Sequence, residues 1–194
     1  MSVLCLLDLS AAFDTVDHEL LVKRLECKFG IVGQPLEWIK SYLTGRSFSV
    51  KYQSEMSSTV NLVCSVPQGS VLGPLLFILY TSELPEVASC YNTHVHSYAD
   101  DTQLFLHCKL QDVGDAVLSM DKCIADMKGW MASNCLKLNP DKTEVLWTAS
   151  SKPLMQLNLS ELVLNLDPHG SCTVTPTNSA RLLGVLITPY LTLR

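Results

Sequence analysis

Two adjacent aspartates, Asp100 and Asp101, lie between two segments of high β-propensity. Residues 94–99 lead into the pair and residues 102–107 lead out of it, which predicts a hairpin with the aspartates at or near its turn. Adjacent carboxylates repel each other, and a divalent metal ion removes that repulsion. Mg²⁺ prefers oxygen ligands and commonly binds one or two carboxylates together with substrate phosphates. Because solvated turns also contain Asp-Asp pairs, this pair alone leaves both interpretations open.

A further aspartate comes at the end of the first predicted strand. Residues 3–7 form a continuous apolar run that is typical of a buried central strand, and Asp8 ends it. A central strand at the very start of the sequence suggests a chain truncated at its N-terminus. If the end of this strand lies beside the hairpin, Asp8 joins Asp100 and Asp101. Three such carboxylates can hold two Mg²⁺ or Mn²⁺ ions about 3.5–4 Å apart, an arrangement that serves in-line displacement at phosphorus.

The remaining periodicities predict the elements that must position these acids. Pro140 and Asp141 separate two short β-prone segments, 136–139 and 142–148, that read as a strand pair. A second predicted strand pair covers 46–52 and 59–66, and weaker strand signals cover 162–166 and 182–187. The helical repeats predict an α+β fold, an antiparallel sheet backed by helices, with the helices at 17–29, 35–45, 71–80 and 111–134.

Composition excludes several classes of protein. The 194 residues are 47% hydrophobic, which allows a sizeable core, and 14 Lys and Arg against 19 Asp and Glu leave a net charge of −5. That balance argues against a self-sufficient nucleic-acid binder. The eight cysteines contain no C-x-x-C pair, so we interpret them as reduced core cysteines of an intracellular protein. We predict neither a signal peptide nor a transmembrane segment.

Four motifs occur in order along the chain, at 7–14, 66–74, 98–102 and 136–144. Together they resemble the palm motifs of a reverse transcriptase, closest to non-LTR (LINE-type) retrotransposons, and residues 181–185 resemble the strand that follows. The resemblance implies a ferredoxin-like polymerase palm in residues 1–150 (motifs A to D). Residues 151–194 would be a partial palm-to-thumb connection, in a chain lacking most of the fingers and thumb.

The resemblance also assigns metal ligands by position. Asp8, Asp100 and Asp101 would be catalytic and would bind two Mg²⁺ or Mn²⁺ ions. The backbone carbonyl of Leu9 would be a further ligand.

Four other positions match residues that contact the nucleotide. Phe13 matches the bulky residue that excludes a ribose 2′-hydroxyl, and Gln68 and Gly69 match a loop against the incoming nucleotide and template. Lys142 matches a lysine near the triphosphate. Each also has a structural interpretation. Phe13 could be a core phenylalanine, Gln68 and Gly69 a strand-to-helix turn, and Lys142 a surface lysine. Asp14 follows the pattern too, but we expect it to be structural, at a helix start.

The function implied is that of an RNA-directed DNA polymerase domain of a retroelement. It would transfer a nucleotide from a dNTP to a primer 3′-hydroxyl on an RNA template, in the cytoplasm and nucleus. The missing fingers and thumb would come from the parent polyprotein. The alternative is a truncated, non-catalytic retroelement remnant, and a two-metal nuclease is a remote third hypothesis.

Overall fold

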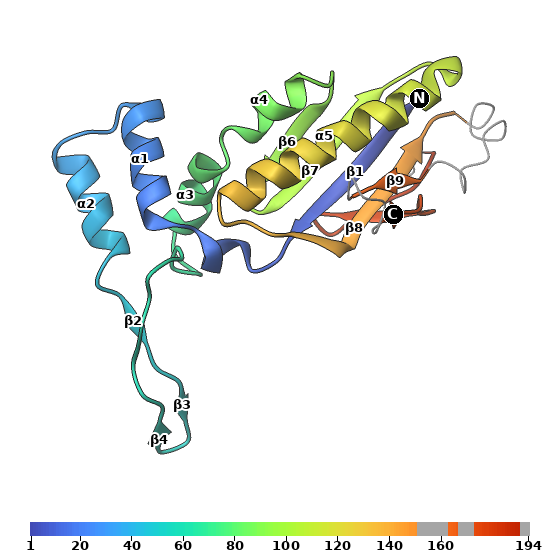
Figure 1. Cartoon of the computed structure of the whole chain (residues 1–194). Helices are drawn as coiled ribbons and strands as arrows, with labels where there is room; N and C mark the ends of the chain where they lie inside the picture. The colour runs from blue at the N-terminus through green and yellow to red at the C-terminus, as the bar shows by residue number, and fades with distance from the viewer. Residues whose placement is uncertain (151–162, 167–172, 191–194) are drawn as a thin grey trace.

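The first strand of the chain, β1 (Ser2–Leu9), lies inside a four-stranded antiparallel sheet (Figure 1). The computed structural model describes residues 1–150, 163–166 and 173–190. The strand order is β6 (His94–Tyr98), β7 (Asp101–His107), β1, β8 (Leu138–Thr148). A helical crossover joins β1 to β6, and helix α5 (Val113–Ser133) joins β7 to β8. This is the split β-α-β connectivity of a ferredoxin-like fold, as predicted.

Side chains of β1 alternate between a dry face and an open face of the sheet. Val3, Cys5, Leu7 and Leu9 are buried, while the residues between them are only half-buried. The prediction of a buried central strand is confirmed, although the strand runs one residue past Asp8. Because Asp8 has the opposite parity to the buried set, its side chain belongs to the open face.

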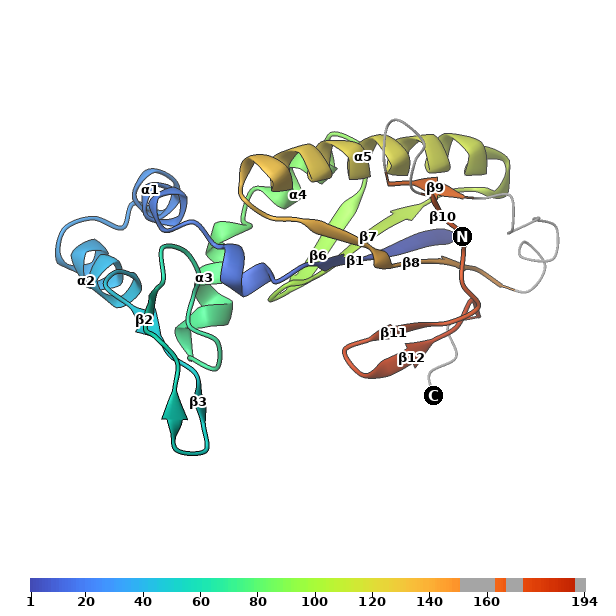
Figure 2. The same ribbon diagram turned by 60° about the horizontal axis from the view of Figure 1, so that its bottom comes forward.

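Helix α5 covers the dry face of the sheet (Figure 2). Its buried residues recur at helical spacing, as the predicted helix over 111–134 required, and they are Val113, Ala116, Met120, Cys123, Ile124, Met127 and Met131. The methionine stripe is therefore core. On the other face of the sheet lies a small hairpin of β11 (Ala180–Leu182) and β12 (Val185–Ile187). A short pair, β9 (Leu164–Asn165) with β10 (Thr173–Val174), completes this end of the molecule.

The crossover between β1 and β6 contains four α-helices. A 3-10 turn (Ala12–Thr15) precedes α1 (His18–Phe29), which begins where the Asp17 carboxylate accepts from the Leu20 amide and ends at Gly30, with φ 65°. Then come α2 (Gln34–Leu43), α3 (Leu72–Tyr80) and α4 (Leu84–Ser89), of which only α4 was not predicted. Phe29, the last residue of α1, is 39% exposed, whereas Leu21 and Leu25 of the same helix are buried.

Between α2 and α3 the chain forms a long hairpin that projects away from the sheet (Figure 1). It contains two short ladders: β2 (Ser47–Phe48) with β5 (Val60–Asn61), and β3 (Lys51–Tyr52) with β4 (Glu55–Met56). The predicted strand pair is thus confirmed in position, but its strands are shorter than expected.

The predicted strand pair around Pro140 and Asp141 is wrong. Residues 138–148 form one strand, β8, with a bulge: Leu6 pairs with Glu144, whereas Asp8 already pairs with Asn139. Proline has no amide hydrogen for the ladder, so the chain loops out there and pairing resumes on both sides.

The prediction of core cysteines is only partly correct. Cys5 and Cys123 are buried, but Cys27, Cys90 and Cys135 are exposed, and all seven cysteines in the described residues are free. Within the same residues, no helix is both long and apolar enough to cross a membrane.

One polar cluster ties the crossover helices to α5. The Arg24 side chain, 9% exposed, contacts the Glu83 carboxylate at 3.1 Å and the Asn134 side-chain oxygen at 2.7 Å, and it donates to the Tyr80 carbonyl. Its guanidinium also lies 5.2 Å from the ring centroids of Tyr80 and Trp130. A planar cation with several donors can serve all of these partners at once.

We therefore expect Arg24→Met to lower the free energy of unfolding by about 2 kcal/mol, since it leaves a partly buried carboxylate and carbonyl without their donor. Urea unfolding measures the change. Lys40→Met is the control, because Lys40 is in an exposed ion pair with Glu37 on the outside of α2 and should leave stability unchanged. Equal losses in both variants would contradict this role for Arg24.

Candidate active site

The Asp-Asp pair lies at the tip of the β6–β7 hairpin, as predicted. Tyr98 pairs with Asp101, so Ala99 and Asp100 form a two-residue turn. Ala99 has φ 55°, in the left-handed region that glycine usually occupies. This tight turn places Asp100 at the tip and Asp101 at the first position of β7.

The pairing of β1 with β7 brings Asp8 to the same edge of the sheet. Leu7 pairs with Thr102, so Asp8 is the next residue along β1, just as Asp101 is along β7. The electrostatics agree: partial burial, and then the charges of Asp100 and Asp8, raise the pKa of Asp101. In the part of the chain that the structure describes, no three Asp, Glu, His or Cys side chains lie close enough together to hold a metal ion.

Two residues from the β8 bulge contact Asp8. The Lys142 ammonium lies 3.7 Å from the Asp8 carboxylate, and the Asn139 side-chain amide donates to the same oxygen at 3.4 Å. Lys142 was singled out in the sequence, whereas Asn139 was missed. The sequence feature that could have identified Asn139 is its position next to Pro140. That position is informative only once the bulge in β8 is known.

A cavity of about 470 Å³ opens beside the hairpin tip. It is lined by Phe13, Pro67, Gln68, Gly69, Ser70, Gly73, Pro74 and Asp100. Its size is that of a small-molecule site. Three of the four predicted nucleotide-contacting residues therefore share one cavity with one of the three aspartates, and the fourth, Lys142, lies at Asp8.

Packing fixes the walls of this cavity. The Phe13 ring packs against Phe77 of α3 with centroids 5.1 Å apart. In the turn that begins α3, the Ser70 hydroxyl donates to the Pro67 carbonyl at 2.6 Å and accepts from the Gly73 amide at 3.0 Å. A Cβ atom at Gly73 would lie only 3.1 Å from that carbonyl, so a larger residue would crowd this close turn.

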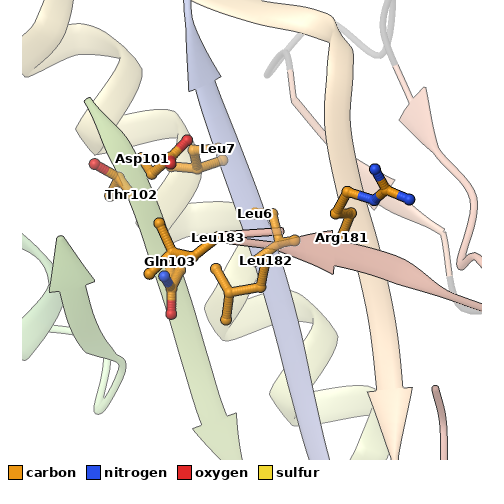
Figure 3. A pocket seen from close by; sticks show the side chains of 8 residues that line it. All are labelled: Leu6, Leu7, Asp101, Thr102, Gln103, Arg181, Leu182 and Leu183. Atoms are coloured by element: carbon orange, nitrogen blue, oxygen red, sulfur yellow. The ribbon is translucent and has the colours of Figure 1, made fainter. Parts of the chain in front are cut away.

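The hairpin of β11 and β12 lies over the open face of the sheet next to Asp101 (Figure 3). Leu182 and Leu183, with Leu6 and Gln103 of the sheet, line a small cavity of about 50 Å³ there. The guanidinium of Arg181 points away from Asp101. Residues 181–185, expected to form a strand, form the tip of this hairpin instead.

Comparison with known proteins identifies the family. The family model for reverse transcriptase (RNA-dependent DNA polymerase) matches residues 2–187. Among curated proteins, the chain is 30% identical over 190 residues to the probable RNA-directed DNA polymerase from transposon X-element of Drosophila melanogaster, covering 96% of the chain and 19% of the relative. It is 31% identical over 142 residues to that from transposon BS of the same species, covering 71% of the chain and 15% of the relative. The chain thus spans a fifth or less of these relatives.

Solved structures share the fold. Telomerase from Candida albicans, solved with a fragment of telomeric RNA, superposes with a TM-score of 0.65 at 15% identity, covering the whole chain and 30% of the telomerase. Apo telomerase from Candida tropicalis gives 0.65 at 13% identity, covering the whole chain and 35% of the telomerase. From the family match and the mobile-element relatives together, the chain belongs to the reverse transcriptase family and is related to LINE-type elements.

Proposed function

We propose that this chain is the palm of an RNA-directed DNA polymerase that extends a DNA primer on an RNA template. The observation that carries the proposal is the cavity that joins Phe13, Gln68 and Gly69 to Asp100 at the tip of the acidic hairpin. Residues 1–150 would form the palm. The connection proposed for 151–194 includes the β11–β12 hairpin, while 151–162, 167–172 and 191–194 lie outside the described residues.

Asp8, Asp100 and Asp101 form an acidic edge where β1 ends and β7 begins, and this acidic edge suits divalent cations. Proteins of this family generally use divalent metal ions, and we propose that Asp8, Asp100 and Asp101 hold two Mg²⁺ or Mn²⁺ ions. Such a pair activates a 3′-hydroxyl and neutralises the charge on the triphosphate. Partial burial, and then the charges of Asp100 and Asp8, raise the pKa of Asp101, and a bound cation would offset both effects. Leucine has no side-chain oxygen, so Leu9 could add a further ligand only through its backbone carbonyl.

The neighbouring residues would select and hold the dNTP. The Phe13 ring, held by Phe77, would occupy the space that a ribose 2′-hydroxyl needs. Gln68 and Gly69, which line the same cavity, would also contact the nucleotide. Lys142 is 68% exposed and only loosely paired with Asp8, so it can turn toward the triphosphate.

Charge indicates what else the reaction requires. Duplex binding depends largely on Lys and Arg at phosphates, and this chain has only 14 of them against 19 acids. We propose that fingers and thumb from the parent polyprotein supply the positive charge that binds the duplex. The RNA template, DNA primer and dNTP would be met inside the cell, in the cytoplasm or nucleus.

Metal binding can be tested on the isolated chain by thermal melting. Since the pKa of Asp101 is higher in the folded state than its ordinary value of 3.8, the native state loses stability as the pH rises through the interval between the two values. We expect metal-free Asp101→Asn to melt above wild type at neutral pH, and this advantage to vanish below about pH 4. Mn²⁺ should raise the Tm of wild type and have little effect on the variant.

Glu55→Gln is the matched control, because Glu55 lies at the tip of the projecting hairpin, away from the acidic edge. It should respond to Mn²⁺ as wild type does. A Mn²⁺ response that survives Asp101→Asn unchanged would contradict metal binding at this edge.

Activity can be tested by placing residues 2–187 in the fingers and thumb of one of the related transposon polymerases. We expect primer extension on an RNA template, and a loss of at least about 1000-fold in Asp101→Asn, since two-metal stabilisation amounts to several kcal/mol. Phe13→Ala should lower the preference for dNTP over rNTP by at least about tenfold, because the steric barrier is gone. A folded chimera that binds template but shows no extension would favour the non-catalytic remnant.

A further inference from the structure

One side-chain hydrogen bond beside the cavity has no role in the catalysis proposed above. The Gln68 side-chain amide nitrogen donates to the Asp14 carboxylate at 3.1 Å. We propose that Asp14 is a positioning residue, which fixes the orientation of the Gln68 amide so that Gln68 presents its carbonyl oxygen to a hydrogen-bond donor on the incoming nucleotide. This inference rests on the proposed function of the cavity. Of the described residues, Gln68 lines that cavity and Asp14 does not.

The backbone holds the two side chains in register. The Val66 amide donates to the Phe13 carbonyl at 2.9 Å, and the Ser65 amide donates to the Val16 carbonyl at 2.8 Å. These two bonds bracket Asp14 and anchor the segment that leads into Gln68. Asp14 and Gln68 are both exposed, but the backbone bonds hold the two segments that carry them side by side.

The chemistry of the pair fixes which end of the amide faces which way. A carboxylate can only accept hydrogen bonds, so the amide nitrogen of Gln68 must face Asp14. The nitrogen and oxygen of an amide diverge from one carbon atom, so the carbonyl oxygen is directed away from Asp14. Without the carboxylate the amide could flip and offer a donor where the nucleotide would need an acceptor.

A hydrogen-bond acceptor at this position can contact only those parts of a nucleotide that carry a donor. Phosphate oxygens of a metal-bound triphosphate are acceptors and cannot hydrogen-bond to a carbonyl oxygen. The contact must therefore reach the sugar or the base, where hydroxyl and amino groups can donate. Loss of the orientation should weaken nucleotide binding while leaving the binding of a bare phosphate chain unchanged.

The first test uses the polymerase chimera described above, with Asp14→Asn. We expect the KM for dNTP to rise about three- to tenfold with kcat within about twofold, since the orienting bond serves binding rather than the chemical step. Inhibition by pyrophosphate should be unchanged. Asp14→Glu, which keeps an acceptor-only group, should recover part of the loss. A rise in KM together with an equal weakening of pyrophosphate inhibition would overturn the inference.

A double-mutant cycle separates orientation from a general structural effect. In a Gln68→Ala background, Asp14→Asn should raise the KM no further, because the group that Asp14 orients is gone. An equal rise in both backgrounds would overturn the inference. Wild-type extension that is abolished by Asp101→Asn would show, separately, that the proposed function stands.

The orientation itself can be measured without activity, by NMR of the side-chain amide of Gln68 in the isolated chain. The Asp14→Asn variant should shift these amide signals, which Gln68→Ala identifies by their loss. The control Asp115→Asn, on the first turn of α5, should leave them in place. Unshifted signals in Asp14→Asn would overturn the inference, whereas an inactive wild-type chimera would count against the proposed function alone.

Discussion

The pairing of β1 with β7 forces like charges together at one edge of the sheet. The two strands pair up to Leu7 and Thr102. The next residues in this register, Asp8 and Asp101, therefore lie beside each other. The β6–β7 turn adds Asp100 to them. Partial burial, and then the charges of Asp100 and Asp8, raise the pKa of Asp101. Concentrated negative charge of this kind suits the cation binding proposed for these residues.

The two faces of the sheet divide the structural and chemical roles. On one face, the alternating residues of β1 pack with the methionine-rich side of α5 and supply the hydrophobic core. On the other face lies the β11–β12 hairpin (Figure 2). The crossover helices are joined to α5 through Arg24, which steadies α3 and, with it, Phe77 behind Phe13. Packing between the helices thus supports the wall of the cavity beside the hairpin tip.

Local signals in the sequence predicted most of the fold. Periodicity was sufficient for β1 and α5, and capping residues were sufficient for the ends of α1, because these features depend on neighbours in the chain. The β8 bulge was missed, since a proline between two apolar segments also fits a turn, and only pairing with β1 decides between them. Asn139 and the bond between Asp14 and Gln68 were missed for the same reason: each depends on residues more than 50 positions apart.

The central claim is that Asp8, Asp100 and Asp101 form one two-metal site. Electron paramagnetic resonance of Mn²⁺ bound to the chain in the presence of dNTP tests it most directly. Two ions about 4 Å apart are magnetically coupled, so the account predicts a coupled Mn²⁺ pair that disappears in Asp8→Asn. A spectrum of isolated Mn²⁺ ions that is the same in wild type and in Asp8→Asn would contradict it.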